Sequence, residues 1–260
     1  MDFTIIRYIQ LIKILQNKGF SFQTFEEFIK NPILTNCLIL RHDVDRLPEK
    51  ALKLAKIENI LGIKASYYFR IVNDSNRPEI IRQISELKHE IGYHYEDLAL
   101  ARGNLKIAIT TFENNLQYFR KFSPVKTISM HGSPLSKWDN KDIWIAYDYK
   151  DYGVIAEPYF DVNFDKVFYI TDSSRSWNNT NVSLRDKVKT RFHYRIKSSN
   201  DIIDLLKRSD PPKTIMINIH PHNWSDNWFD WIKVLIWQQF KNMIKRIIIE
   251  FRKHKTANTG

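Results

Sequence analysis

Two carboxylates separated by a single residue, Asp43 and Asp45, stand where an apolar run ends. The run, residues 37–44 (CLILRHDV), is typical of a buried strand. Because strand side chains alternate, both carboxylates point to one side and His42 points to the other. Two like charges so placed repel each other unless a cation or a shared proton lies between them. The pair therefore predicts metal binding or proton transfer, although either aspartate could instead cap the helix that follows.

Other polar residues follow further strand-like runs along the chain. His94, His131, Asp172 and His220 each come at or just after such a run. The runs alternate with helical patterns, as in a parallel α/β arrangement, and in a barrel the strand ends converge on one face. Strands are expected over 37–44, 65–71, 90–95, 125–130, 154–156, 167–170 and 214–219, and helices over 49–61, 78–88, 104–121 and 202–207.

Three of these side chains suit a catalytic divalent metal. Asp45, His94 and His131 offer the oxygen and nitrogen ligands of a site with one open position. Zinc is the first candidate, with cobalt, nickel or manganese as alternatives, because such an ion lowers the pKa of its water towards neutrality. Taken singly, each histidine could instead be buried and hydrogen-bonded to the backbone. Their joint position at strand ends favours ligation.

The remaining polar residues suggest an acid and a base. Asp43 would take a proton from the attacking water. His220 could protonate a leaving group at neutral pH, since the ordinary pKa of histidine is about 6.5. Asp172 would orient that histidine and fix its tautomer.

Four later residues are candidates for substrate contacts. Arg175 could hold an anionic group, and His222 follows the candidate acid closely. Trp177 and Trp224 are natural platforms for a sugar ring, although a buried tryptophan is the commoner case.

Composition limits the alternatives. A chain of 260 residues can bury one substantial core, and its seven glycines show no linker, so one domain over 1–260 is expected. The single cysteine, Cys37, excludes a disulfide framework and a cysteine-based zinc site. The net charge of +11 suits an anionic substrate, an anionic membrane or nucleic acid, or reflects a lysine-rich surface. No nucleic-acid motif accompanies the charge, so no nucleic acid is expected as a partner.

The two ends of the chain both predict helices. Residues 1–20 form an amphipathic pattern with basic residues rather than a signal peptide, which favours a cytoplasmic protein. Residues 226–254 have apolar side chains at helical spacing and many lysines. This helix either packs on the core as the last helix of a barrel or lies on an anionic bilayer beside a lipid-linked substrate. The second alternative would make the protein peripheral at the inner face of the membrane.

Three motifs together resemble the polysaccharide deacetylase family (the NodB-homology fold, carbohydrate esterase family four). They are RHDVD at 41–45, HEIGYH at 89–94 and IHPH at 219–222, and the similarity spans about residues 39–224. The resemblance implies a distorted TIM-like (β/α)7 barrel and metal-dependent hydrolysis of an acyl group on a sugar. It also implies that Asp43 is the base, Asp45 a metal ligand and His220 the general acid.

One position departs from the family pattern. Leu98 stands where the family has a second metal histidine, so His131 is expected to replace it, with Glu96 or Asp97 as alternatives. The expected activity is removal of an acetyl or formyl group from the nitrogen of an amino sugar. A nucleotide- or lipid-linked intermediate of surface polysaccharide biosynthesis fits a cytoplasmic enzyme. The alternatives are a non-catalytic carbohydrate-binding relic of the same fold and a basic nucleic-acid-binding protein.

Overall fold

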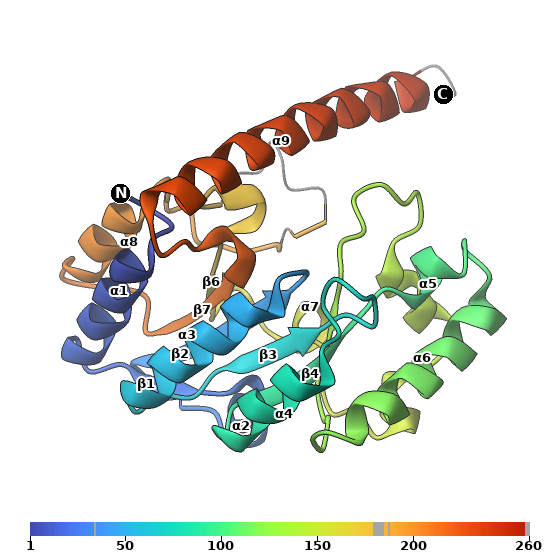
Figure 1. Ribbon diagram of the computed structural model, residues 1–260, viewed down its shortest axis with the longest axis horizontal. Coiled ribbons are helices and arrows are strands. Elements are labelled where there is room, and N and C mark those ends of the chain that lie inside the picture. Colours follow the sequence, from blue (N-terminus) through green and yellow to red (C-terminus); the bar gives the residue numbers. More distant parts are fainter. Residues whose placement is uncertain (34, 179–184, 187, 258–260) are drawn as a thin grey trace.

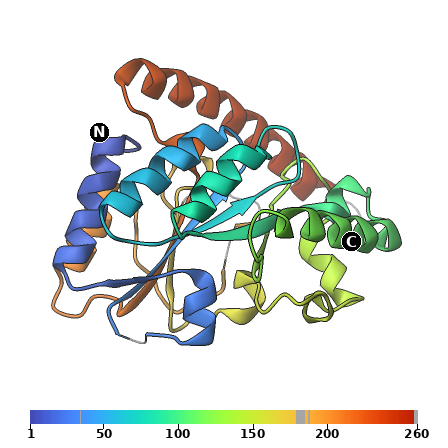
Figure 2. The ribbon, with the colours of Figure 1, turned by 60° about the horizontal axis from the view of Figure 1, so that its bottom comes forward.

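The protein forms one curved sheet of parallel strands with helices packed on its outer face (Figures 1 and 2). The computed structural model describes residues 1–33, 35–178, 185–186 and 188–257, with side chains up to residue 243. The six main strands run in the order β5-β4-β3-β2-β7-β6. They are β2 (Cys37–Val44), β3 (Ser66–Phe69), β4 (Glu90–Tyr95), β5 (Ile128–Met130), β6 (Phe168–Thr171) and β7 (Thr214–Ile219).

The expected α/β barrel class is confirmed as a half-barrel. Within the described residues no strand joins β5 to β6. The segment expected as a strand at 154–156 makes only a single bridge, between Ala156 and Thr127. A short strand that the sequence pattern did not indicate, β1 (Ser21–Gln23), pairs with the start of β2.

Helices follow most strands, as the sequence pattern predicts. In both ribbon views α3 and α4 lie side by side on the outer face of the sheet (Figures 1 and 2). Pro48 opens α3, where its missing N–H has no helical partner to lose. The α-helices are α1 (Ile5–Asn17), α2 (Phe25–Lys30), α3 (Pro48–Ile60), α4 (Pro78–Glu86), α5 (Asp97–Leu100), α6 (Leu105–Arg120), α7 (Pro158–Asp161), α8 (Ser199–Leu206) and α9 (Trp228–Ala257), and the 3₁₀ turns are η1 (Asn140–Ile145), η2 (Tyr149–Tyr152), η3 (Ser173–Arg175) and η4 (Pro221–Asn223).

The core has two layers. The larger layer lies between the sheet and the outer helices, and the smaller one fills the inside of the curve below the strand ends. Gly92 belongs to this inner side, where a Cβ atom would lie 2.3 Å from the ring of Tyr68. The absence of a side chain there lets β3 and β4 pack closely beneath His94, which is two residues further on.

The C-terminal helix α9 is anchored on the body through its first half. The Trp231 indole donates to the Asp2 carbonyl oxygen at 2.6 Å, and the Asn242 amide donates to the Ser174 carbonyl oxygen at 3.1 Å. Packing on the body is therefore confirmed for this part of the helix. In Figure 1 the later part of α9 extends away from the sheet.

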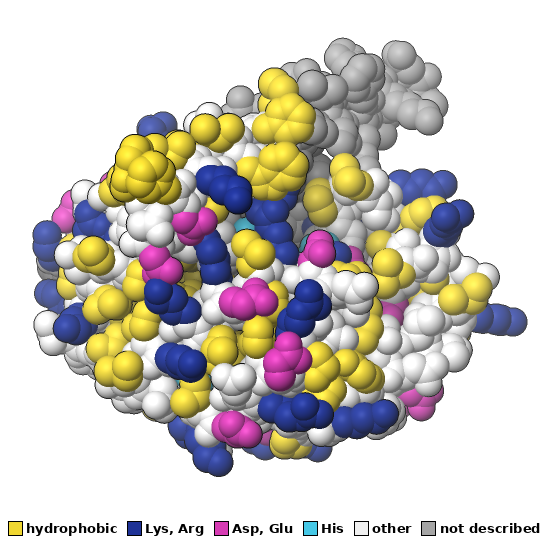
Figure 3. Space-filling view, in the orientation of Figure 1, with side chains coloured by type: hydrophobic (Ala, Val, Ile, Leu, Met, Phe, Trp, Pro, Cys, Tyr) yellow, Lys and Arg dark blue, Asp and Glu magenta, His cyan; other side chains and the backbone are white. Residues whose placement is uncertain are grey.

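The same helix also presents apolar side chains to solvent. Figure 3 shows them gathered along α9, above a hollow in the molecule. No helix in the described part of the chain is both long and apolar enough to cross a membrane. Contact of this helix with an anionic bilayer stays a prediction. The exposed side chains are Trp228, Phe229, Ile236, Trp237, Phe240 and Met243.

Candidate active site

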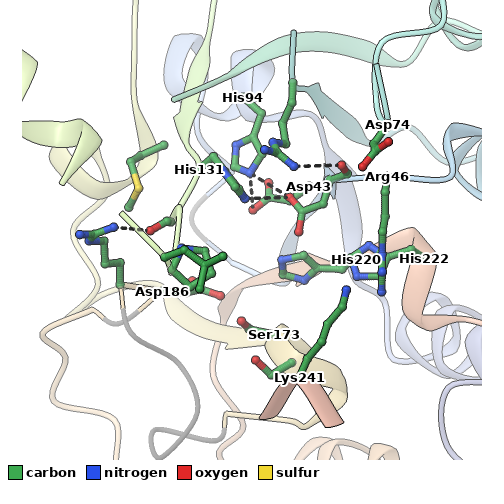
Figure 4. A pocket seen from close by; sticks show the side chains of 18 of the residues that line it. Asp43, Arg46, Asp74, His94, His131, Ser173, Asp186, His220, His222 and Lys241 are labelled. Atoms are coloured by element: carbon green, nitrogen blue, oxygen red, sulfur yellow. Dashed lines mark hydrogen bonds and ion pairs between the residues drawn. The ribbon is translucent and has the colours of Figure 1, made fainter. Parts of the chain in front are cut away.

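A pocket of about 560 Å³ opens at the carboxyl ends of the strands (Figure 4). The predicted residues Asp43, Asp45, His94, His131 and His220 all line it. They come from different strand ends, which in parallel α/β folds converge on one face. The predicted convergence is therefore confirmed.

Asp45 and two histidines bring three donor atoms together. The Asp45 Oδ1 atom lies 3.5 Å from His94 Nε2 and 3.7 Å from His131 Nε2. The Nδ1 atom of His94 donates to the Ser129 carbonyl oxygen at 2.9 Å, and that of His131 lies 2.8 Å from Glu96 Oε2. Because these partners engage Nδ1 of each ring, both Nε2 atoms are turned towards Asp45.

These three side chains have the donor atoms of a divalent-metal site. Ligands about 2.1 Å from a tetrahedral ion are separated by about 3.4 Å, close to the spacing seen around Asp45. Asp45 Oδ1 is also buried with no hydrogen-bond partner in the described part of the chain. As the side chains stand in that part of the chain, no group of three or more His, Cys, Asp or Glu side chains is arranged so that it could hold a metal ion. An ion would therefore require the three side chains to move closer together.

Glu96 orients His131 rather than adding a ligand of its own. Its carboxylate receives two hydrogen bonds from Arg70, at 2.8 and 2.7 Å, besides its contact with His131. Asp97, the other alternative ligand, accepts hydrogen bonds from Tyr93 and Asn115, and burial raises its pKa to about 6. It does not line the pocket.

Leu98, in the position of the missing histidine, is buried in the hydrophobic core. The structure places His131 beside Asp45 and His94, as the sequence analysis expected.

Asp43 is held by two cationic or polar neighbours. Arg41 donates to both carboxylate oxygens, at 2.9 and 2.7 Å, and the Asn218 amide donates at 2.9 Å. Burial alone would raise the pKa of Asp43, but the charge of Arg41, followed by those of His94 and His220, lowers it to about 2. Asp43 is therefore ionised at neutral pH and able to accept a proton.

His220 and Asp172 form a buried pair. Asp172 Oδ1 lies 2.7 Å from His220 Nδ1 and accepts from its backbone N–H at 2.9 Å. Burial opposes the charged imidazole, but the hydrogen bond and charge of Asp172, followed by the charges of Asp45 and Asp43, raise the pKa of His220 to about 10. His220 thus carries a proton at neutral pH, as a general acid must.

Three of the four residues expected to contact the substrate do not line the pocket. Trp177 and Trp224 are each 1% exposed, pack against each other in the core and do not line the pocket. Trp224 instead donates its indole N–H to Asp172 at 2.8 Å. The Arg175 guanidinium lies over the rings of Phe3 and Trp231. His222 lines the pocket as expected.

Sequence reasoning missed the role of Arg41 and did not single out Arg46 or Lys241, which both line the pocket. The alternation that places Asp43 and Asp45 together also places Arg41 on their side, so a signal for Arg41 was present. Lys241 comes from α9, and no local pattern shows which turn of that helix meets the pocket.

No protein-family model matches the chain, and no curated protein does. Solved structures are similar at low identity. A CE4 esterase of Streptococcus mutans is 14% identical, with 92% of this chain and 91% of that chain covered and a TM-score of 0.44. A family 4 carbohydrate esterase from Bacillus anthracis is 12% identical, covering 89% and 86%, with a TM-score of 0.41. Bacillus subtilis PdaA, a family 4 carbohydrate esterase, is 11% identical, covering 89% and 84%, with a TM-score of 0.41.

Proposed function

We propose that the protein is a metal-dependent hydrolase that removes an N-acyl group, acetyl or formyl, from an amino sugar. The observation that carries the proposal is the convergence of His94 Nε2 and His131 Nε2 on Asp45 Oδ1 at the pocket. The amino sugar and the acyl group are inferred from the resemblance of the RHDVD, HEIGYH and IHPH motifs to the polysaccharide deacetylase family. A place in surface polysaccharide biosynthesis stays a prediction of the same kind.

Asp45, His94 and His131 would hold the ion, with zinc as the first candidate and cobalt, nickel or manganese as alternatives. Such an ion supplies acidification of the attacking water and polarisation of the acyl carbonyl. The pKa of about 2 makes Asp43 a weak base by itself, so it depends on that acidification. Its fixed contacts with Arg41 and Asn218 leave little freedom to reorient when it accepts the proton.

Hydrolysis then needs a proton on the leaving nitrogen. Water adds its oxygen to the acyl carbon, Asp43 takes a water proton, and the carbon–nitrogen bond breaks. His220 gives its proton to the nitrogen, so that the products are a carboxylic acid and a free amino sugar. Asp172 acts as a positioning residue, because it holds His220 in the protonated state and in one orientation.

The test compares two pocket carboxylates. Asp43→Asn removes the proposed base, whereas Asp74→Asn changes an exposed pocket carboxylate with no assigned role. Release of acetate from an N-acetylated amino sugar by the zinc-loaded protein should fall about 10²–10⁴-fold in Asp43→Asn. The zinc content should stay unchanged, and Asp74→Asn should remain near wild type.

A carbohydrate-binding relic predicts a different outcome. Sugar would bind to the wild-type protein, but no acyl group would be released with any of the four metals, and Asp43→Asn would bind sugar as the wild type does.

A further inference from the structure

Three side chains that the proposed reaction does not use gather beside His220. Arg46 follows β2, His222 belongs to η4, and Lys241 comes from α9, and all three line the pocket. In Figure 4 they lie on the side of His220 that faces away from His94 and His131, and the Lys241 ammonium points towards His220 and His222. Three separate elements thus supply nitrogen donors to one end of the pocket.

Two of these side chains have unused hydrogen-bonding capacity. His222 is 7% exposed, and its Nδ1 atom is buried with no partner in the described part of the chain. The Arg46 guanidinium is attracted by Asp45 and Asp74, but neither carboxylate is within ion-pair distance of it in the described residues. A buried polar atom without a hydrogen bond lowers the stability of the folded protein unless a ligand supplies that hydrogen bond.

The position of Lys241 is set by the body of the protein. One residue further along α9, Asn242 donates to the carbonyl oxygen of Ser174 in η3. Ser174 itself has a left-handed backbone, with a φ of 61°. Lys241 also lies over the Trp237 ring, with its Nζ atom 5.3 Å from the ring centre. The ammonium is therefore held at the pocket rather than free to sweep through solvent.

We propose that Arg46, His222 and Lys241 form a subsite for a phosphate group carried by the amino-sugar substrate. The assignment rests on the proposed function in one respect, namely the orientation in which the substrate lies in the pocket. His220 protonates the nitrogen that stays on the sugar, so the sugar lies at His220 and the acyl group on the side of His94 and His131. A substituent on the sugar then falls among the three donors. Arginine and lysine are the side chains that bind phosphate oxygens most strongly.

The test uses binding, so it does not depend on turnover. The full-length chain is kept metal-free with a chelator and titrated at low salt with N-acetylglucosamine 1-phosphate and with N-acetylglucosamine. The phosphate should tighten binding by about tenfold or more, as expected for charge-assisted hydrogen bonds. Lys241→Met should remove most of that preference, and Arg46→Gln should weaken it. Lys233→Met is the matched control, since it removes the same charge from an exposed position of the same helix.

A second arm identifies the source of the phosphate. Phosphatidylcholine vesicles with and without a polyprenyl phosphate compete with N-acetylglucosamine 1-phosphate. Displacement only by the polyprenyl phosphate, lost in Lys241→Met, indicates a lipid-borne group. Displacement by neither vesicle indicates a soluble sugar phosphate, and both results support the subsite.

Equal binding of the two sugars would overturn the subsite, as would an equal loss of the preference in Lys233→Met and Lys241→Met. Acyl release is measured separately on the zinc-loaded protein. Release without a phosphate preference would remove the subsite and leave the hydrolase standing. A Lys241-dependent preference without release would do the reverse.

Discussion

Two clusters of imidazole and carboxylate groups lie on opposite faces of β2, and they differ in whether they face the pocket. On the outer face the Glu58 carboxylate accepts hydrogen bonds from Tyr8 and Tyr67 and lies 2.7 Å from His42 Nε2. His89 lies close by. These side chains are completely or almost completely buried. His42 Nδ1 has no hydrogen-bond partner in the described residues, but none of these side chains lines the pocket.

The inner cluster contains similar groups but is left incomplete. Asp45 Oδ1 has two imidazoles nearby and no hydrogen bond in the described residues, and the pocket opens beside it. The comparison teaches that residue types alone do not distinguish a structural cluster from a functional one. The open pocket beside the inner cluster does.

The largest expected effect separates the two clusters by activity. His94→Ala should reduce acyl release to about a thousandth or less, because loss of the ion removes several kcal/mol of transition-state stabilisation. His42→Ala removes a histidine from the same strand system without touching the pocket, and the folded fraction of that variant should keep its activity. Rates are normalised to folded protein by circular dichroism. Similar activity losses in both variants would erase the distinction.

The next effect separates the clusters by stability. Glu58→Gln should cost about 3–5 kcal/mol, because it breaks a buried ion-pair and hydrogen-bond network. Asp45→Asn should cost less, since the contacts of Asp45 Oδ1 with His94 and His131 are long, at 3.5 and 3.7 Å. Urea unfolding of both metal-free variants measures the difference. A larger loss in Asp45→Asn would contradict an open, ligand-ready site.

A smaller effect concerns the carboxylate that orients His131. Glu96→Gln should weaken zinc binding about 10–100-fold, the usual cost of removing a carboxylate partner of a ligand histidine. Asp97→Asn changes the neighbouring carboxylate, which contacts Tyr93 and Asn115 instead. Competition with a zinc chelator compares the two. Equal affinities would remove Glu96 from the site.

The smallest effect is a shift in pH dependence. A general acid works while protonated, so the rate should stay level through neutral pH and fall as pH rises through about 10, the pKa of His220. In Asp172→Asn burial remains while the partner charge is lost, so the pKa falls and the decline moves towards neutral pH. The pH profile of kcat measures this shift. An unchanged upper limb would mean that another group is the acid.

Much of the fold follows from local pattern. The strands β2, β4 and β7 were predicted over their observed residues because each is a buried, largely apolar run. The strand β1 has only three residues, too few to show a period. Segment 154–156 was predicted as a strand because it is apolar, but an apolar run forms a strand only where a neighbouring strand pairs with it. Here only a single bridge forms, between Ala156 and Thr127.

The site residues, too, divide into those that the sequence pattern predicts and those that it does not. Asp43, Asp45, His94 and His220 could be predicted because strand ends of a parallel sheet share one face. Arg175 could not be placed, because its side chain follows a left-handed backbone, with a φ of 56°, and points between two aromatic rings. Trp177 and Trp224 have the residue type of a sugar platform, but their burial depends on packing with distant residues such as Phe3.

Metal content after reconstitution tests the central claim most directly. The purified chain is loaded with zinc, freed of excess by gel filtration and analysed by mass spectrometry beside Asp45→Asn and His94→Ala. A site built from Asp45, His94 and His131 predicts about one zinc per wild-type chain and less than about a tenth of one in either variant. Less than about a tenth of an equivalent in the wild type, with zinc, cobalt, nickel and manganese alike, would contradict it.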